Sequence, residues 1–152
     1  MRQQLAARTR AGGAPSPGTR YWRGWLLGWS GMVLAALLNG TLRALVTQPL
    51  LGETAARALA TVLLLAVLAG YQWWLSGRFP LPSTRAALQV GAAWTAMTLA
   101  FEVGFGRLVE QLSWAQVFAD YDVTRGRIWV LVPVWLLVGP ATVRALRSRS
   151  RR

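Results

Sequence analysis

Polar side chains with the chemistry to bind or exchange ions lie within or beside long apolar stretches of this chain. They recur one helical turn apart, and they are Asn39, Arg43, Glu53, Arg57, Thr98 and Glu102. Where an acid precedes an arginine by four residues, a helix brings the two side chains together in the favourable order. Ionisable groups in apolar helices point away from lipid, pair with each other and are candidates for function.

Two interpretations of this polar cluster stay open. In the first, Arg43 or Arg57 pairs with Glu102, and the ion pair holds three helices together. In the second, the same groups line a pocket open to the outside, which binds an anion through the arginines or carries a proton on Glu102. The charges lie toward one end of their helices, where an ion pair is less costly, so the depth favours the structural interpretation.

A second group of polar and aromatic residues follows the third apolar stretch. Its members are Trp114, Asp120, Asp122, Arg127 and Trp129. Ser113 with Gln116 three residues later is a capping-box pattern, which predicts a short helix over about 114–121. The spacing of the acids matches no cation-binding loop and arginines lie nearby, so we expect no metal site and no cofactor.

Long apolar helices must position both groups. The charge-free runs 25–42 and 58–77 have 18 and 20 residues, and two further runs are shorter. A bilayer core about 30 Å thick needs about 20 helical residues. The predicted fold is an all-α polytopic membrane protein, a four-helix transmembrane bundle with a short interfacial helix between spans 3 and 4. We expect the spans at about 24–46, 55–75, 86–106 and 127–145.

The placement of charge predicts the orientation. Only 14% of the residues are charged, and the 17 basic residues, all arginine, stand against five acids. Residues 1–23, 76–85 and 144–152 hold 12 of the arginines and no acid. Because cytoplasmic segments carry the excess of arginine, both termini are expected in the cytoplasm.

The two ends of the chain are expected to lie outside the membrane domain. Residues 1–20 are predicted to form a disordered basic arm, 21–146 the four-span domain, and 147–152 a basic tail. The tail is expected to contact anionic lipid at the cytoplasmic face rather than nucleic acid.

The composition of the chain and the spacing of its small residues bear on possible metal sites, catalytic sites and helix contacts. The chain has no cysteine and no histidine, which excludes thiolate metal sites and the usual catalytic triad. Tryptophans, including Trp25, fall near the predicted span ends, as they do at membrane interfaces. A four-residue stripe at 92, 96, 100 and 104 predicts close helix packing or a homodimer.

The C-terminal half resembles a known group. The segments 101–106 (FEVGFG), 113–114 (SW), 120–122 (DYD) and 126–129 (GRIW) resemble an uncharacterised family of small four-span bacterial integral membrane proteins. The resemblance implies a multi-pass protein of the bacterial inner membrane and no particular activity. It marks as positions to test Arg43, Glu102, Trp114, Asp120, Asp122, Arg127 and Trp129.

These observations favour a non-enzymatic structural or accessory subunit of the membrane, with a second copy or an unknown membrane protein as partner. The alternative is a small transporter, or an anion- or proton-coupled binding protein, that uses the polar cluster. A membrane enzyme is disfavoured because the polar groups do not converge on one site in the sequence pattern.

Overall fold

A computed structural model describes residues 17–119, 121–122 and 127–150. Within these ranges the chain is mainly helical and contains no strand, which confirms the all-α prediction. The elements are α2 (Pro17–Leu42), the π-helical segment η1 (Arg43–Thr47), α3 (Gln48–Leu51), α4 (Glu53–Arg78), α5 (Thr84–Leu108), α6 (Trp114–Ala119) and α7 (Leu131–Arg149). Three helical stretches are long and apolar enough to cross a membrane, namely Arg20–Leu51, Glu53–Arg78 and Thr84–Leu108.

The helix boundaries differ from the predictions mainly at the beginning of the chain. Helix α2 begins at Pro17 and therefore includes residues 17–20, which we had placed in the disordered arm. Proline is accommodated in the first turn of a helix, because its missing N–H has no partner there in any case. Residues 1–16 of the arm and 151–152 of the tail lie outside the described residues.

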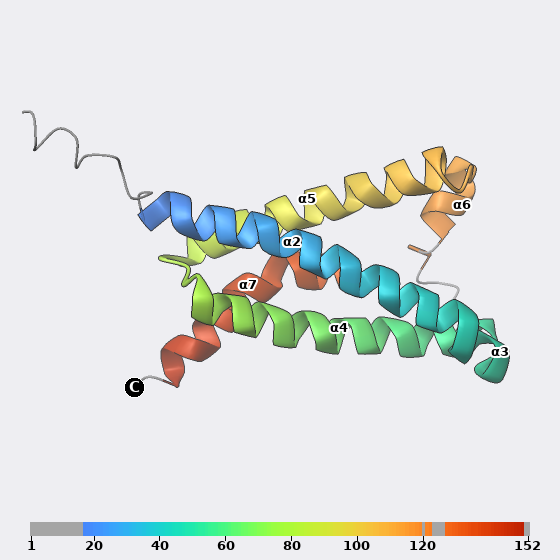
Figure 1. Ribbon diagram of the computed structural model, residues 1–152, viewed down its shortest axis with the longest axis horizontal. Coiled ribbons are helices and arrows are strands. Elements are labelled where there is room, and N and C mark those ends of the chain that lie inside the picture. The colour runs from blue at the N-terminus through green and yellow to red at the C-terminus, as the bar shows by residue number, and fades with distance from the viewer. Residues whose placement is uncertain (1–16, 120, 123–126, 151–152) are drawn as a thin grey trace, which may run out of the picture.

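The four long helices form one bundle (Figure 1). Helix α7 packs against α5 and α4, and α2 packs against α4 and α5. The start of α2 and the end of α7 lie at one end of the bundle, whereas α3 and α6 lie at the other (Figure 1). Residues far apart in the sequence are therefore brought together at the end that carries α3 and α6.

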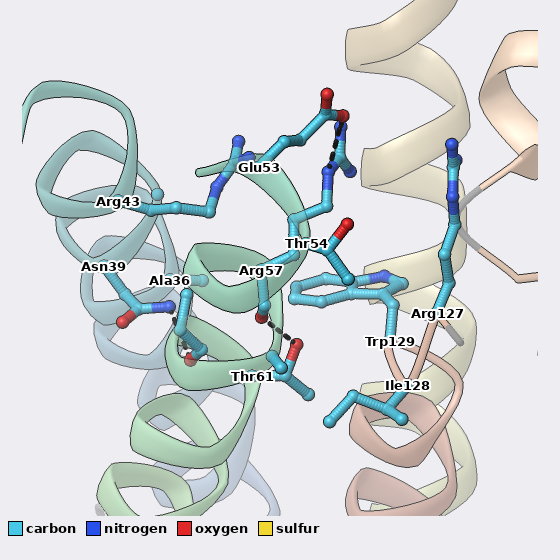
Figure 2. A pocket seen from close by; sticks show the side chains of 13 residues that line it. Ala36, Asn39, Arg43, Glu53, Thr54, Arg57, Thr61, Arg127, Ile128 and Trp129 are labelled. Carbon is cyan, nitrogen blue, oxygen red and sulfur yellow. Dashed lines mark hydrogen bonds and ion pairs between the residues drawn. The ribbon is translucent and has the colours of Figure 1, made fainter. Parts of the chain in front are cut away.

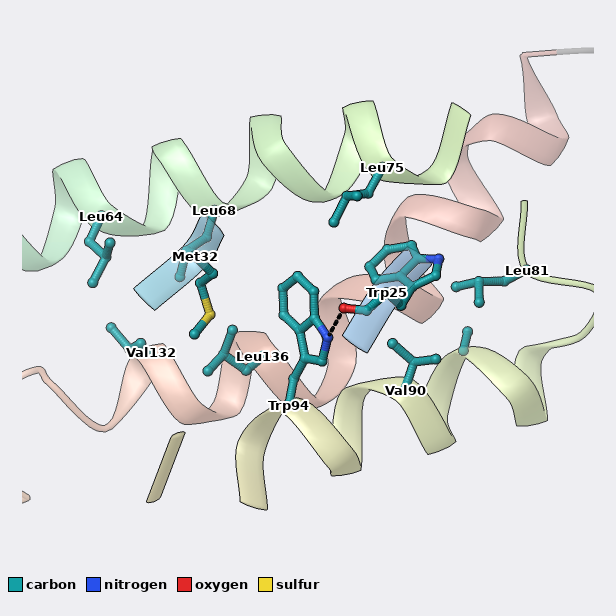
Figure 3. Packing of buried hydrophobic residues seen from close by; sticks show 11 residues of the cluster. Trp25, Met32, Leu64, Leu68, Leu75, Leu81, Val90, Trp94, Val132 and Leu136 are labelled. Carbon is teal, nitrogen blue, oxygen red and sulfur yellow. Dashed lines mark hydrogen bonds between the residues drawn. The ribbon is translucent and has the colours of Figure 1, made fainter. Parts of the chain in front are cut away.

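Two buried tryptophans, Trp25 and Trp94, lie side by side in the hydrophobic core. Trp25 and Trp94 are both fully buried, with ring centroids 5.5 Å apart (Figure 3). The Trp94 indole N–H donates to the carbonyl oxygen of Trp25 at 2.9 Å, and the Trp25 indole N–H donates to that of Phe79 at 2.9 Å. Because each N–H has a carbonyl acceptor, the rings are buried without an unpaired donor.

Close packing between α5 and α7 occurs at a glycine outside the predicted small-residue stripe. A Cβ atom added at Gly91 would lie 2.0 Å from the carbonyl oxygen of Leu137. Ala92, Ala96 and Ala100 of the stripe are exposed in this single chain. The stripe therefore does not serve packing within the chain, because α5 turns the face with Gly91 toward α7.

The end of α2 is wound more widely than an α-helix. In η1 the N–H of Gln48 donates to the carbonyl oxygen of Arg43, five residues earlier. Pro49 has no N–H to donate and crowds the preceding turn, which explains why the α-helical pattern fails just before it. Gly52 then separates α3 from α4 with φ 77° and ψ 168°, a conformation almost restricted to glycine.

Arginines near the end of α7 attach this helix to the other elements. The Arg144 guanidinium donates to the carbonyl oxygen of Leu81 at 3.1 Å and to the hydroxyl of Thr84 at 3.2 Å. The Arg147 guanidinium donates to the carbonyl oxygen of Trp73 at 2.6 Å and lies 4.4 Å from the centroid of its ring. These contacts fix the end of α7 beside the connection between α4 and α5.

Candidate functional site

A cleft of about 370 Å³ opens at the end of the bundle that carries α3 (Figure 2). Its walls are the end of α2 with η1, the first two turns of α4, and the segment 127–129 that precedes α7. The side chains with polar or aromatic groups along it are Asn39, Arg43, Glu53, Thr54, Arg57, Thr61, Arg127 and Trp129. The cleft thus combines four members of the predicted polar cluster with two members of the second predicted group.

The α2 side of the cleft carries Asn39 and Arg43. The Asn39 amide donates to the carbonyl oxygen of Ala60 at 2.9 Å and so ties α2 to α4. The half-buried Arg43 guanidinium donates to the side-chain oxygen of Gln48 at 3.3 Å, across the wide turn of η1. Within the described part of the chain Arg43 makes no ion pair, so its charge has a neutral amide as hydrogen-bond partner.

The α4 side contains the predicted ion pair one turn apart, which is confirmed. A guanidinium nitrogen of Arg57 lies 2.9 Å from Glu53 Oε1, and the Arg57 Nε–H donates to the same oxygen at 3.1 Å. The Glu53 side chain is 59% exposed and that of Arg57 35% exposed. Because water screens such pairs, this one contributes only about 0.3–0.5 kcal/mol to stability. Below it, the buried Thr61 hydroxyl donates to the carbonyl oxygen of Arg57 at 2.9 Å.

The third wall is formed by Arg127 and Trp129, both half-buried. Figure 2 shows these two side chains across the cleft from α2, with the Trp129 ring beside α4. Among the described residues, three guanidinium groups and one carboxylate therefore border the cleft, and their formal charges sum to +2.

A second, smaller cavity of about 130 Å³ adjoins the first, and both are lined by Ala36 and Trp129. It contains Thr98 and Glu102, the remaining members of the predicted polar cluster. The Thr98 hydroxyl accepts a hydrogen bond from the Trp29 indole at 3.1 Å. The rest of its lining is almost entirely aliphatic or aromatic.

Glu102 is bonded by two aromatic residues rather than by the arginines that we expected. The Tyr121 hydroxyl donates to one carboxylate oxygen, and the Trp129 indole N–H donates to the other at 3.1 Å. No ion pair joins Glu102 to Arg43 or Arg57 among the residues that the structure describes. Arg57 reaches Glu53 within its own helix and Arg43 reaches Gln48, so local partners replace the expected one across the bundle.

The sequence interpretation missed Tyr121 and the wide turn of η1. Tyr121 lies at the end of the predicted short helix, and its hydroxyl is the kind of donor that a half-buried carboxylate needs. Gln48-Pro49 is the signal that would have indicated a break in the helix just after Arg43.

Of the remaining members of the second predicted group, Trp114 and Asp122 are not among the described residues that line the cleft. Trp114 is exposed on α6, with the Arg107 guanidinium 4.9 Å from its ring centroid. Asp122 lies in the turn after α6, and Asp120 lies outside the described residues. The capping box is confirmed, because the Ser113 N–H donates to the Gln116 side chain at 2.8 Å and the Gln116 N–H to the Ser113 hydroxyl at 3.3 Å.

The arrangement is suited to binding an anion. Guanidinium groups present planar pairs of N–H donors that match the oxygens of a carboxylate or phosphate. Searches against protein-family models, curated proteins and solved structures found no match to this chain.

Proposed function

We propose that this chain is a four-span protein of the bacterial inner membrane that binds an anionic group in a cleft facing outward. The observation that carries the proposal is the cleft of about 370 Å³ bordered by three guanidinium groups and one carboxylate. Arg43 supports it further, since its guanidinium donates to the neutral Gln48 side chain. A positively charged recess with low-dielectric walls attracts and concentrates anions.

The membrane topology in this proposal rests on helix length and on charge. Helix α7 has 19 residues, or about 28 Å, and this length, close to the thickness of the bilayer core, supports the proposal of a fourth span. The end of the bundle with the start of α2 and the end of α7 is the arginine-rich end, so it is placed in the cytoplasm. The cleft then faces outward, and α6 lies along the outer surface with Trp114 and Phe118 exposed toward lipid headgroups.

The structural or accessory role remains the second candidate, and the bonding of Glu102 favours it for that residue. Both carboxylate oxygens accept hydrogen bonds from aromatic residues, one in the turn after α6 and one just before α7. Glu102 thereby connects α5 to both of these segments. We assign Glu102 this structural role and assign anion binding to the arginines of the cleft.

The absence of native cysteine makes accessibility the first test. A single Asn39→Cys variant, treated in intact cells with a membrane-impermeant thiol reagent, is expected to be labelled because position 39 lines the cleft. Leu38→Cys is the matched control, since Leu38 is 62% exposed on the lipid side of the same helix and has no aqueous access there. Ser83→Cys tests the orientation and is expected to react only after the cells are permeabilised. If positions 38 and 39 react equally, no aqueous cleft separates them and the proposal fails.

The second test measures binding directly. Inorganic phosphate is expected to raise the melting temperature of the purified protein, because a ligand that binds only the folded state stabilises it. The Arg43→Gln variant is expected to need about tenfold more phosphate for the same rise in melting temperature, since a hydrogen bond to a charged group contributes about 1.5–3 kcal/mol. Arg85→Gln removes the same charge from an exposed position away from the cleft and is the control. Equal behaviour of the two variants would contradict anion binding at this site.

A further inference from the structure

The cleft and the second cavity are lined by consecutive stretches of the same two helices, α2 and α4. The cleft is lined by α2 and η1 over positions 36–43 and by α4 over 53–61, whereas the second cavity is lined by α2 over 32–37 and by α4 over 64–68. The second cavity therefore lies about one turn deeper in the bundle. Ala36 and Trp129 border both, so the charged space and the apolar one adjoin at these residues.

The deeper cavity has the lining of a site for hydrocarbon. Met32, Leu64 and Leu68 are buried and line it together with Phe101 and Val132. Apolar cavities of this kind stay dry and accept apolar ligands, and one of about 150 Å³ holds benzene. A volume of about 130 Å³ therefore accommodates a few methylene groups.

The polar groups in this cavity already have partners within the protein. Glu102 accepts from Tyr121 and Trp129, and Thr98 accepts from Trp29. These side chains consequently keep their hydrogen bonds when a hydrocarbon chain enters the cavity.

From this succession of a charged cleft and an apolar cavity we infer that the ligand is an anionic amphiphile. Its phosphate or carboxylate head lies among Arg43, Arg57 and Arg127, and its apolar chain passes Ala36 and Trp129 into the deeper cavity. This inference rests on the proposed function and adds the class of ligand to it. A bilayer supplies such molecules next to the cleft, with their charged heads at the same depth as the outer ends of the helices.

The test compares three compounds on the purified protein in a neutral detergent: inorganic phosphate, octyl phosphate and octanol. Each dissociation constant is calculated from the concentration of the compound that stays in water, after the share dissolved in the detergent micelles is subtracted. One buried methylene contributes about fourfold in affinity, so two or more make octyl phosphate at least tenfold tighter than phosphate. Octanol lacks the charge and is expected to bind at least tenfold more weakly than octyl phosphate.

Two neighbouring substitutions separate the deeper cavity from the cleft. Val33 lines only the deeper cavity, so Val33→Phe is expected to fill it and remove the advantage of octyl phosphate while phosphate binding stays unchanged. Leu34→Phe introduces the same ring at the adjacent position, which is 58% exposed, and leaves both affinities unchanged. Unchanged phosphate binding also shows that Val33→Phe is folded. If that variant does not fold, alkyl phosphates of two, four, six and eight carbons test the same point on the native chain, whose affinity must rise with length.

The outcomes distinguish the inference from the proposed function. Equal affinity for phosphate and octyl phosphate overturns the amphiphile and leaves anion binding in place. Octanol as tight as octyl phosphate overturns the role of the charged head. If neither phosphate nor octyl phosphate binds, the proposed function itself is wrong.

Discussion

Replacement of Gly91 by alanine is expected to disrupt the contact between α5 and α7. The added Cβ would lie 2.0 Å from the carbonyl oxygen of Leu137, 2.8 Å from its carbonyl carbon and 3.0 Å from the carbonyl oxygen of Leu136. Carbon atoms do not approach an oxygen closer than about 3 Å, so the helices must separate by about 1 Å. All three obstructing atoms belong to the backbone, and no side-chain rotation relieves the contact. We therefore expect a loss of about 3 kcal/mol, the upper part of the range for overpacked cores.

The control is the same substitution on the same helix at Gly104, where an added Cβ meets nothing within 4 Å. Alanine stabilises a helix interior by about 0.5–1 kcal/mol relative to glycine, so Gly104→Ala is expected to be slightly stabilising. Free energies of unfolding are measured by titrating each protein from mild detergent into SDS and following tryptophan fluorescence. Opposite signs for the two variants are the expected result. If Gly91→Ala matches Gly104→Ala, α5 and α7 do not meet as described.

The same unfolding assay checks four further predictions. Gly52→Ala is expected to lose about 1–3 kcal/mol, because its backbone conformation is strained for any residue with a Cβ; a loss below 0.5 kcal/mol would contradict that conformation. Glu53→Gln is expected to change stability by less than about 0.5 kcal/mol, and a larger effect would mean that the exposed pair with Arg57 is poorly screened. Gln72→Met is expected to stabilise by about 1 kcal/mol or more, since the Gln72 amide is fully buried and makes no hydrogen bond; destabilisation would indicate a bridging water. Ser113→Ala is expected to lose about 1 kcal/mol with the capping box of α6, and no loss would mean that this helix does not contribute to folding.

Local patterns in the sequence were sufficient to predict the helices and their nearest-neighbour contacts. Charge-free runs located the long helices, because their length and composition depend on the chain alone. The Glu53–Arg57 pair and the Ser113–Gln116 capping box were also predicted correctly. Each joins residues three or four apart, so the helix geometry determines whether they meet.

Features that depend on how the helices pack were not predictable in this way. The face that α5 turns toward α7 is decided by Gly91 and its neighbours rather than by the more regular alanine stripe. Trp25 is buried because a carbonyl acceptor at Phe79 is available 54 positions later in the chain, which no local pattern indicates. The two cavities are likewise properties of the packed bundle, although most polar residues that border them had been identified.

The bonding of Glu102 has a consequence for how the two cavities join. We expected Arg43 or Arg57 to pair with Glu102; both arginines line the cleft and Glu102 lines the deeper cavity, so either pair would join the two spaces. Instead, Trp129 forms part of both linings and donates its N–H to Glu102, which holds the carboxylate against the wall. Arg43 is held by Gln48 at the wide turn before Pro49. The contacts that satisfy this carboxylate thus leave the charged cleft and the apolar cavity next to each other, an arrangement that an amphiphile with a charged head requires.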